Sequence, residues 1–224
     1  MAENLLQNPG MEGDYYQFDG VGELTIAPRW RPWFVQEPGV HRPEFKAETV
    51  GVGSGRVHSG DKAQKQFTTF ARHQGGIYQV VQVTPGEWYT FSAWAYVWSS
   101  SEDNPDESVR DGKYSALVGI NPWGDERATY RTTVWGKEAL NVYNQWVRVS
   151  VTAEAWSDNI VVFTHGACEY GVKHSDSYWD DCVLTLADMG GGTEPPPPPP
   201  PPGDVDYARI KADVADVLAE WDRR

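Results

Sequence analysis

The sequence predicts an all-β protein: residues 1–188 form an antiparallel β-sandwich (jelly roll), followed by a polyproline linker and a short C-terminal α-helix. Two observations predict the sandwich. Short runs of β-branched and aromatic residues are separated by Gly, Pro, Asn and Asp, and no long segment with a 3.6-residue hydrophobic period lies between them. Such a succession of short, turn-bounded strands is typical of sandwiches and jelly rolls.

The predicted strands cover most of this region. In chain order they span residues 22–26, 44–49, 66–71, both arms of a hairpin within 76–100, 115–120, 129–135, 146–153, 159–164 and 178–186. Residues 27–42 form a long insert rich in proline and aromatic residues, and long loops of this kind tend to be functional. Residues 99–111 are acidic and lack apolar anchors, which favours a solvated loop over a calcium-binding one.

The hairpin is the strongest local signal in the chain. Pro85 and Gly86 provide the fixed φ and the tolerance of positive φ that a tight turn needs, and β-forming residues flank them. Alternation puts one set of side chains of the second strand on a core face: Tyr89, Phe91, Ala93, Ala95 and Val97. Trp94, Tyr96 and Trp98 lie on the other face, so either another part of the protein or a ligand must cover them.

The C-terminal segments are predicted to be separate from the sandwich. Residues 189–203 contain Gly190–Gly192 and the eight prolines Pro195–Pro202, a stiff polyproline spacer of roughly 25 Å. Residues 204–224 show an amphipathic helical pattern, with apolar residues at Tyr207, Ile210, Val214, Val217 and Trp221. Because so short a helix is marginal alone, it is expected to dock on a partner protein, to self-associate or to fold back.

Composition limits the function classes. The net charge of −13 and the lack of a basic patch argue against binding to nucleic acid or anionic membranes. The sequence contains no run of about 18 apolar residues, so membrane insertion is not predicted. The N-terminus lacks the features of a signal peptide. Cys168 and Cys182 are favoured as buried free thiols over a disulfide. The 11 tryptophans exceed what a core of this size needs and suit stacking on a ring-shaped ligand.

Motifs for catalysis are missing from the sequence. It contains no nucleophile elbow, phosphate-binding loop or His-Glu-x-x-His pattern, and its five histidines are dispersed. The number of carboxylates does not decide whether two of them form a glycosidase pair, because the two members of such a pair can be distant in sequence. We therefore expect a protein without enzymatic activity.

The chain resembles carbohydrate-binding modules of the galactose-binding-like jelly-roll class, as found in extracellular, glycan-associated proteins. The resemblance covers residues 4–187 and is carried by six segments: NLLQNPGMEG (4–13), HSGDKAQKQF (58–67), GIYQVVQVTPGEWYTFSAWAYVWS (76–99), VGINPWG (118–124), YNQWVRVSVTAEA (143–155) and VKHSDSYWDDCVLTL (172–186). It implies that Glu12 and Asp180 share a structural Ca²⁺.

The residues around Asp180 provide an independent reason for this metal. Asp180 alternates in phase with Cys182 and Leu184, which predicts that it faces the core. A buried carboxylate is costly unless it is paired or coordinated, and Ca²⁺ prefers such oxygen ligands. The alternatives are hydrogen bonds from backbone amides or a buried Arg. Asp181 is the weaker candidate.

The resemblance also implies two positions for a sugar ligand. Candidates on a concave sheet face are Trp94, Tyr96 and Trp98, and candidates at the loop tips are Trp30, Trp33, Trp123 and Trp135. Arg42 and Glu44 are expected to hydrogen-bond sugar hydroxyls. The remaining strand and turn tryptophans are assigned to structure: Trp88, Trp146, Trp156 and Trp179.

Two functions follow as expectations. The first is a calcium-stabilised, non-catalytic module that binds a neutral glycan or polysaccharide and is displayed on the proline spacer. The second is a structural virion or cell-surface decoration protein attached through residues 204–224. Both place the protein outside the cell or on a particle surface.

Overall fold

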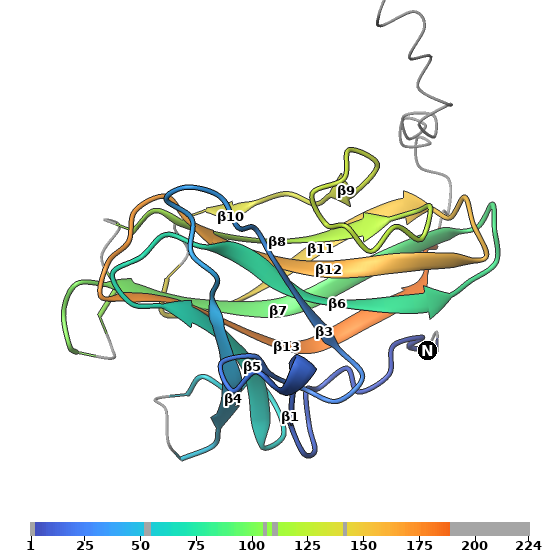
Figure 1. Ribbon diagram of the computed structural model, residues 1–224. Helices are drawn as coiled ribbons and strands as arrows, with labels where there is room; N and C mark the ends of the chain where they lie inside the picture. The colour runs from blue at the N-terminus through green and yellow to red at the C-terminus, as the bar shows by residue number, and fades with distance from the viewer. Residues whose placement is uncertain (1–2, 52–54, 105–106, 109–111, 141–142, 189–224) are drawn as a thin grey trace, which may run out of the picture.

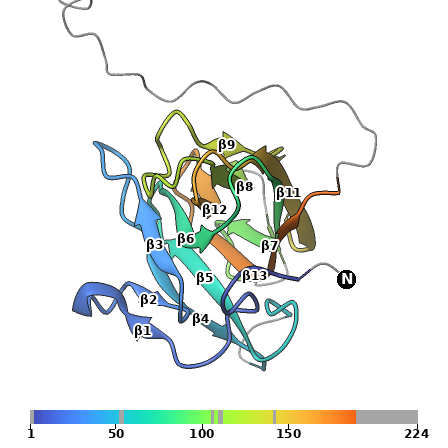
Figure 2. The same cartoon turned by 90° about the vertical axis from the view of Figure 1, so that its right-hand side faces the viewer.

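A computed structural model of the chain describes residues 3–51, 55–104, 107–108, 112–140 and 143–188. In these ranges two antiparallel sheets pack face to face as a sandwich (Figure 1). A small ribbon of β1 (Tyr16–Gln17) and β2 (Thr25–Ile26), joined through the 3-10 helix η1 (Phe18–Gly20), lies beside β4 (Figure 2). The predicted linker and C-terminal helix lie outside the described residues.

One sheet has five strands in the spatial order β11-β7-β13-β5-β4. The last strand of the sandwich, β13, lies at its centre and pairs with the long strand β7 that follows the Pro85-Gly86 turn. Its members are β4 (Glu44–Thr49), β5 (Lys62–Thr68), β7 (Trp88–Ser100), β11 (Trp146–Glu154) and β13 (His174–Leu186).

The other sheet has the order β10-β8-β12-β6-β3, with β9 also paired to β8. The strand before the Pro85-Gly86 turn, β6, belongs to this sheet, whereas the strand after the turn, β7, belongs to the other. The predicted β-hairpin is therefore wrong: the turn forms, but it passes between the layers, because β6 pairs with β12 and β3 while β7 pairs with β11 and β13. Its members are β3 (Arg31–Phe34), β6 (Gln74–Gln82), β8 (Tyr114–Asn121), β9 (Val134–Trp135), β10 (Ala139–Leu140) and β12 (Asn159–Cys168).

The core lies between the sheets and confirms the predicted face of β7. All five residues of the predicted core set are buried there: Tyr89, Phe91, Ala93, Ala95 and Val97. From the other sheet, Ile77, Val118, Ile120 and Val162 pack against them. Full burial of an aliphatic or aromatic side chain contributes roughly 1.5–3 kcal/mol, so this face holds the two layers together.

The strand boundaries differ from the prediction where proline or local polar contacts decide them. The insert contains β3, and Pro32 is tolerated there because β3 is an edge strand. Of the predicted strand 129–135, only Val134–Trp135 forms a strand. The preceding residues form consecutive turns in which Tyr130 N–H donates to Arg127 O and Thr133 N–H donates to Tyr130 O.

The predicted orientation of Asp180 is wrong because β13 contains a β-bulge. The register with β7 shifts between Asp180 and Val183, and Asp181 has a φ of 43°. Asp180 therefore lies opposite Trp94 on the outer face, whereas Leu184 lies opposite Phe91 in the core. One extra residue reverses the alternation of the strand, and simple alternation cannot detect it.

Both cysteines are free and buried, as favoured from the sequence. Burial raises the pKa of the Cys168 and Cys182 thiols above the usual range, so both stay protonated at neutral pH. Among the described residues, no helix is long and apolar enough to cross a membrane.

Candidate functional site

Aromatic side chains converge on the outer face of the six-stranded sheet. Trp33 of β3 and Trp135 of β9 lie with ring centroids 6.2 Å apart, and His165 of β12 lies 5.6 Å from the first and 5.2 Å from the second. Phe163 packs beneath them, in edge contact with Trp33. Two of the tryptophans predicted at loop tips are thus brought together, although about 100 positions separate them in the sequence.

Backbone positions fix both indole rings. The Trp33 indole N–H donates to Thr164 O at 2.9 Å, which ties the edge strand to β12. Trp135 pairs with Gly119 of β8, and a Cβ added at Gly119 would lie 2.6 Å from the indole. The glycine therefore lets the Trp135 ring lie directly against the sheet.

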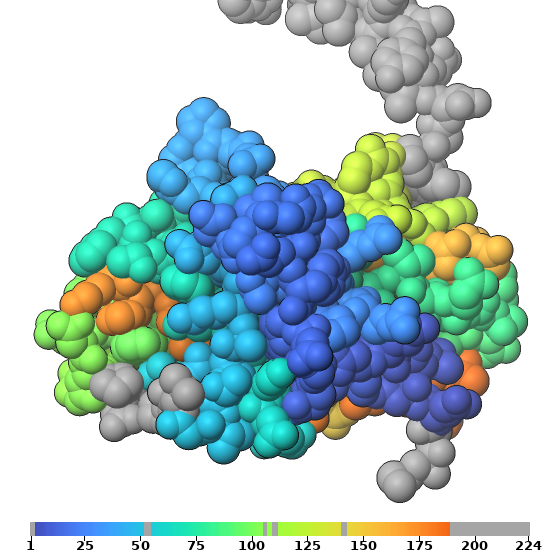
Figure 3. Space-filling view, turned by 60° about the horizontal axis from the view of Figure 1, so that its bottom comes forward, coloured from blue at the N-terminus to red at the C-terminus, as the bar shows by residue number. Residues whose placement is uncertain are grey.

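Three adjoining cavities extend across this face. The first, of about 810 Å³, is lined by Trp33, Tyr78, Arg42 and Thr129 among others. A second cavity of about 880 Å³ shares Tyr78 with it, and a third of about 280 Å³, lined by Trp135 and His165, shares Thr129. In Figure 3, residues 35–42 (light blue) and the loop after residue 124 (yellow-green) project on either side of the N-terminal segment. Together we call these three cavities the groove.

A polar bridge lies between the first two cavities. Tyr78 Oη donates to Glu126 Oε2 at 2.6 Å, and Arg31 Nη1 lies 3.3 Å from the same oxygen. Burial, reinforced by the bond to Glu126, raises the pKa of Tyr78 to about 12, so its hydroxyl stays a donor. Glu126 is exposed and lines both cavities, whereas Arg31 is exposed and lines the second. The sequence prediction included none of these three residues.

His165 contributes a neutral imidazole to the groove. Burial lowers the pKa of His165 to about 4. Its Nε2 lies 3.1 Å from Gln74 Nε2. Its buried Nδ1 has no hydrogen-bond partner among the described residues. The sequence showed His165 only as one of five dispersed histidines, just after the predicted strand 159–164, so its position beside two tryptophans was not predictable.

The structure separates Arg42 from Glu44. Arg42 lines the first cavity, with Nη2 3.9 Å from Glu23 Oε2. Glu44 is exposed at the start of β4 in the other sheet, paired in register with Phe67. Trp30 is fully buried in the core, where its indole N–H donates to Asn8 O at 2.9 Å.

The outer face of the five-stranded sheet carries the other predicted aromatic row, and the chain itself covers it. His58, in the segment between β4 and β5, stacks on Trp94 with ring centroids 4.2 Å apart. The Arg56 guanidinium lies 4.0 Å from the centre of the Trp98 ring. Tyr96 and Trp98 are each only 7% exposed. The prediction left protein or ligand as the cover, and the structure places protein there.

Trp123 lies away from the groove, at one end of the sandwich. Its ring stacks on Trp156, with centroids 5.7 Å apart and an interplanar angle of 22°. Trp156 is 40% exposed, although the sequence assigned it to structure. Trp179 is fully buried in the core, as that assignment expected.

Glu12 and Asp180 both hold the segment that precedes β5. Glu12 Oε1 accepts hydrogen bonds from the amides of Asp61 and Lys62 at 2.8 and 3.1 Å. Asp180 Oδ2 accepts bonds from the amides of His58 and Ser59 at 2.9 and 3.1 Å. These backbone partners are one of the alternatives to calcium that the sequence left open.

The region around these carboxylates also contains a buried hydroxyl. Tyr15 Oη has no hydrogen-bond partner among the described residues, and its pKa is raised by burial and by the charges of Asp180 and Glu12. Within the described ranges, no three His, Cys, Asp or Glu side chains converge as a metal site. The oxygen atoms of Glu12, Asp180 and Tyr15 are nevertheless of the type that a hard cation such as Ca²⁺ prefers, and the two carboxylates supply the negative charge.

Comparisons with known proteins identify the fold. No family model matches the sequence, and no curated protein matches it. The carbohydrate-binding module TmCBM61, solved in complex with β-1,4-galactotriose, aligns over 83% of this chain and 100% of its own length, with a TM-score of 0.52 and 14% identity. Arabinose-bound MgGH51 α-L-arabinofuranosidase aligns over 81% of this chain and 26% of its own, with a TM-score of 0.50 and 11% identity.

A third similar structure is the CBM22-1 xylan-binding domain of Xyn10C from Paenibacillus barcinonensis. It aligns over 83% of this chain and 95% of its own, with a TM-score of 0.47 and 12% identity. The fold of this chain is thus shared with a carbohydrate-binding module, TmCBM61, as the sequence resemblance predicted.

Proposed function

We propose that this protein is a non-catalytic module that binds a neutral glycan along the groove on the outer face of its six-stranded sheet. The observation that supports it best is the convergence of Trp33, Trp135 and His165 beside three adjoining cavities. The shared fold is consistent with this role, because a module of this fold was solved with a bound galactotriose.

The chemistry of the groove suits sugar rings. Indole faces stack on the apolar C–H faces of a pyranose, while a few polar groups bond its hydroxyls. Trp135 is half-buried and supplies the stacking surface, and Arg31, Arg42 and Glu126 line the rim. Because these charges include both signs, the groove has no strong preference for a polyanion.

The test is binding of soluble β-1,4-galactan and xylan fragments to the full chain by isothermal titration calorimetry. Trp135→Ala is expected to weaken binding at least tenfold, which corresponds to about 1.4 kcal/mol. Tyr170→Ala is the matched control, since Tyr170 is 50% exposed and lines none of the three cavities. Equal affinities for Trp135→Ala and the unchanged chain, or no binding to any neutral glycan, would contradict the proposal.

A structural Ca²⁺ held by Glu12 and Asp180 belongs to the same proposal. The buried Tyr15 hydroxyl near two carboxylates supports it, because such a region gains from a cation that oxygen ligands coordinate. The ion would neutralise the buried charge of Asp180 and hold the N-terminal segment against β13. Its role would be stability rather than sugar contact.

The alternative role as a virion or cell-surface decoration protein concerns the C-terminal segments. Its support is the amphipathic pattern of residues 204–224, which calls for an apolar partner. A glycan-binding module attached in this way, outside the cell or on a particle, satisfies both roles. The linker of residues 189–203 then separates the attachment from the sandwich.

A further inference from the structure

The Trp123–Trp156 pair forms an exposed aromatic surface at one end of the sandwich. Trp123 lies in the β8–β9 loop and Trp156 in the β11–β12 loop, and the indole of Trp156 is 40% exposed. Neither residue lines any cavity of the groove. The pair is thus a surface that the proposed glycan site leaves unused.

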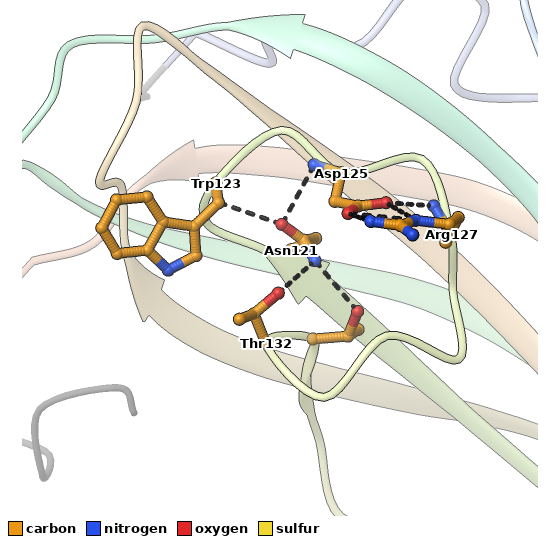
Figure 4. Close-up of polar contacts among 6 residues, drawn as sticks. Asn121, Trp123, Asp125, Arg127 and Thr132 are labelled. Carbon is orange, nitrogen blue, oxygen red and sulfur yellow. Dashed lines mark hydrogen bonds and ion pairs between the residues drawn. The ribbon is translucent and has the colours of Figure 1, made fainter. Parts of the chain in front are cut away.

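Polar contacts hold this surface in place. Asn121 Oδ1 accepts bonds from the amides of Trp123 and Asp125 at 3.0 and 3.1 Å, and its Nδ2 donates to Thr132 Oγ1 at 2.9 Å (Figure 4). The amide of Trp156 donates to Pro122 O at 2.9 Å, which links the two loops. A surface fixed in this way loses little conformational entropy when it binds.

Trp123 also carries an unsatisfied donor. Its indole N–H is buried and has no hydrogen-bond partner among the described residues. Buried donors without an acceptor are costly, so this N–H calls for an acceptor from outside those residues.

The chain leaves the sandwich at this same end. The amide of Ala187 donates to Trp88 O, and Trp88 pairs with Glu154, two residues before Trp156. Ala187 and Trp156 therefore lie about two strand spacings apart, on the order of 10 Å. Figure 1 shows that β13 ends where β11 ends, beside the β11–β12 turn.

The sequence that follows can reach this surface. Residues 188–194 span up to roughly 25 Å when extended, and Gly190–Gly192 allow the chain to reverse. Next come the eight prolines Pro195–Pro202. Proline runs dock on aromatic surfaces. Because proline lacks an N–H, the carbonyl groups of such a run have no hydrogen-bond donors within the run.

We propose that Pro195–Pro202 docks in cis on the Trp123–Trp156 pair. The proline run is favoured over a free ligand because the short tether gives it an effective concentration on the order of millimolar. Docking would fix the direction in which residues 204–224 leave the sandwich.

The experiment records indole N–H signals of the full chain by ¹⁵N NMR, with Trp123→Phe and Trp156→Phe used to assign the two signals. A matched chain of the same length has alternating Gly and Ser at positions 195–202. We expect the Trp123 and Trp156 signals to differ between the two chains, while the Trp33 signal stays in place. Free octaproline at about millimolar concentration should move the Trp123 and Trp156 signals of the Gly-Ser chain toward their positions in the unchanged chain.

Three results would overturn the proposal. The first is identical Trp123 and Trp156 signals in the two chains. The second is a difference that disappears on dilution, which would assign the prolines to a second copy. The third is a pair of signals that responds only to added β-1,4-galactotriose, which would make the surface a glycan site.

Discussion

Asp180 shows how one buried carboxylate couples the fold to pH. Its side chain is fully buried, and burial raises its pKa from 3.8 to about 6, although the amides of Ser59, Asp181 and His58 oppose the rise. Because the folded-state pKa lies above the unfolded value, this group favours folding below about pH 4. That contribution is lost as the pH rises through about 6.

The predicted consequence is measurable by urea unfolding in EDTA. The stability contribution lost between pH 4 and pH 7 is about 2 kcal/mol, because burial raises the pKa from 3.8 to about 6 and a small part of the effect is already lost at pH 4. Asp180→Asn should remove that part of the pH dependence, whereas Asp158→Asn, at an exposed loop position, should keep it. Equal pH dependence in all three chains would show that Asp180 carries no such energy.

Calcium reverses the sign of this effect if the proposed ion binds. At pH 7, Ca²⁺ should raise the melting temperature of the unchanged chain, since the ion binds the folded state and favours ionised Asp180. The rise should be lost in Asp180→Asn and in Glu12→Gln. A melting temperature that Ca²⁺ leaves unchanged would remove the metal from the proposal and leave the backbone amides as the only partners.

At the scale of elements, β8 and β9 decide where the groove has its stacking surface. The two-residue strand β9 is short, yet its pairing with Gly119–Ile120 sets Trp135 against the sheet. The predicted strand 129–135 contained Trp135, but propensity could not show that residues before Val134 turn away from the sheet. The side chain of Asn121 stabilises that loop instead, and such a contact is not visible in a hydrophobic pattern.

Gly119→Ala tests this arrangement. The added Cβ would lie 2.6 Å from the indole, so the Trp135 ring must move outward. Overpacking of this kind typically lowers the free energy of unfolding by roughly 1–3 kcal/mol. Glycan affinity should fall at least about tenfold while the chain remains folded. Gly22→Ala is the control, because its added Cβ meets only an ordinary contact at 3.8 Å. Calorimetric titration of both variants should separate them, and equal affinities would show that the position of the Trp135 ring does not matter.

At the scale of the whole molecule, the sandwich and the segments after residue 188 are expected to have different functions. The groove and the carboxylates of Glu12 and Asp180 all belong to the sandwich, which contains its own core. The proline run and the amphipathic pattern lie beyond residue 188. Binding and attachment should therefore be separable.

Deletion of residues 195–224 tests this division. The truncated chain should keep its affinity for a neutral glycan, because no residue of the groove is removed. Any self-association or docking of the full chain should be lost, as measured by light scattering after size-exclusion chromatography. Loss of glycan affinity on truncation would place part of the ligand site in the tail.

The sequence by itself determined the all-β fold class, the turn at Pro85-Gly86 with a strand on each side, and the core face of β7, because period-2 alternation and turn chemistry are local properties. Only the tertiary structure decided that these two strands belong to different sheets instead of pairing as a hairpin. Only the tertiary structure decided which tryptophans meet. Trp33 and Trp135 share one face because an edge strand and a two-residue strand carry them onto the same sheet, whereas Trp30 is in the core and Trp98 lies beneath Arg56. Those contacts join distant segments, and the bulge at Asp181 reverses a local pattern, so neither could be predicted from neighbouring residues.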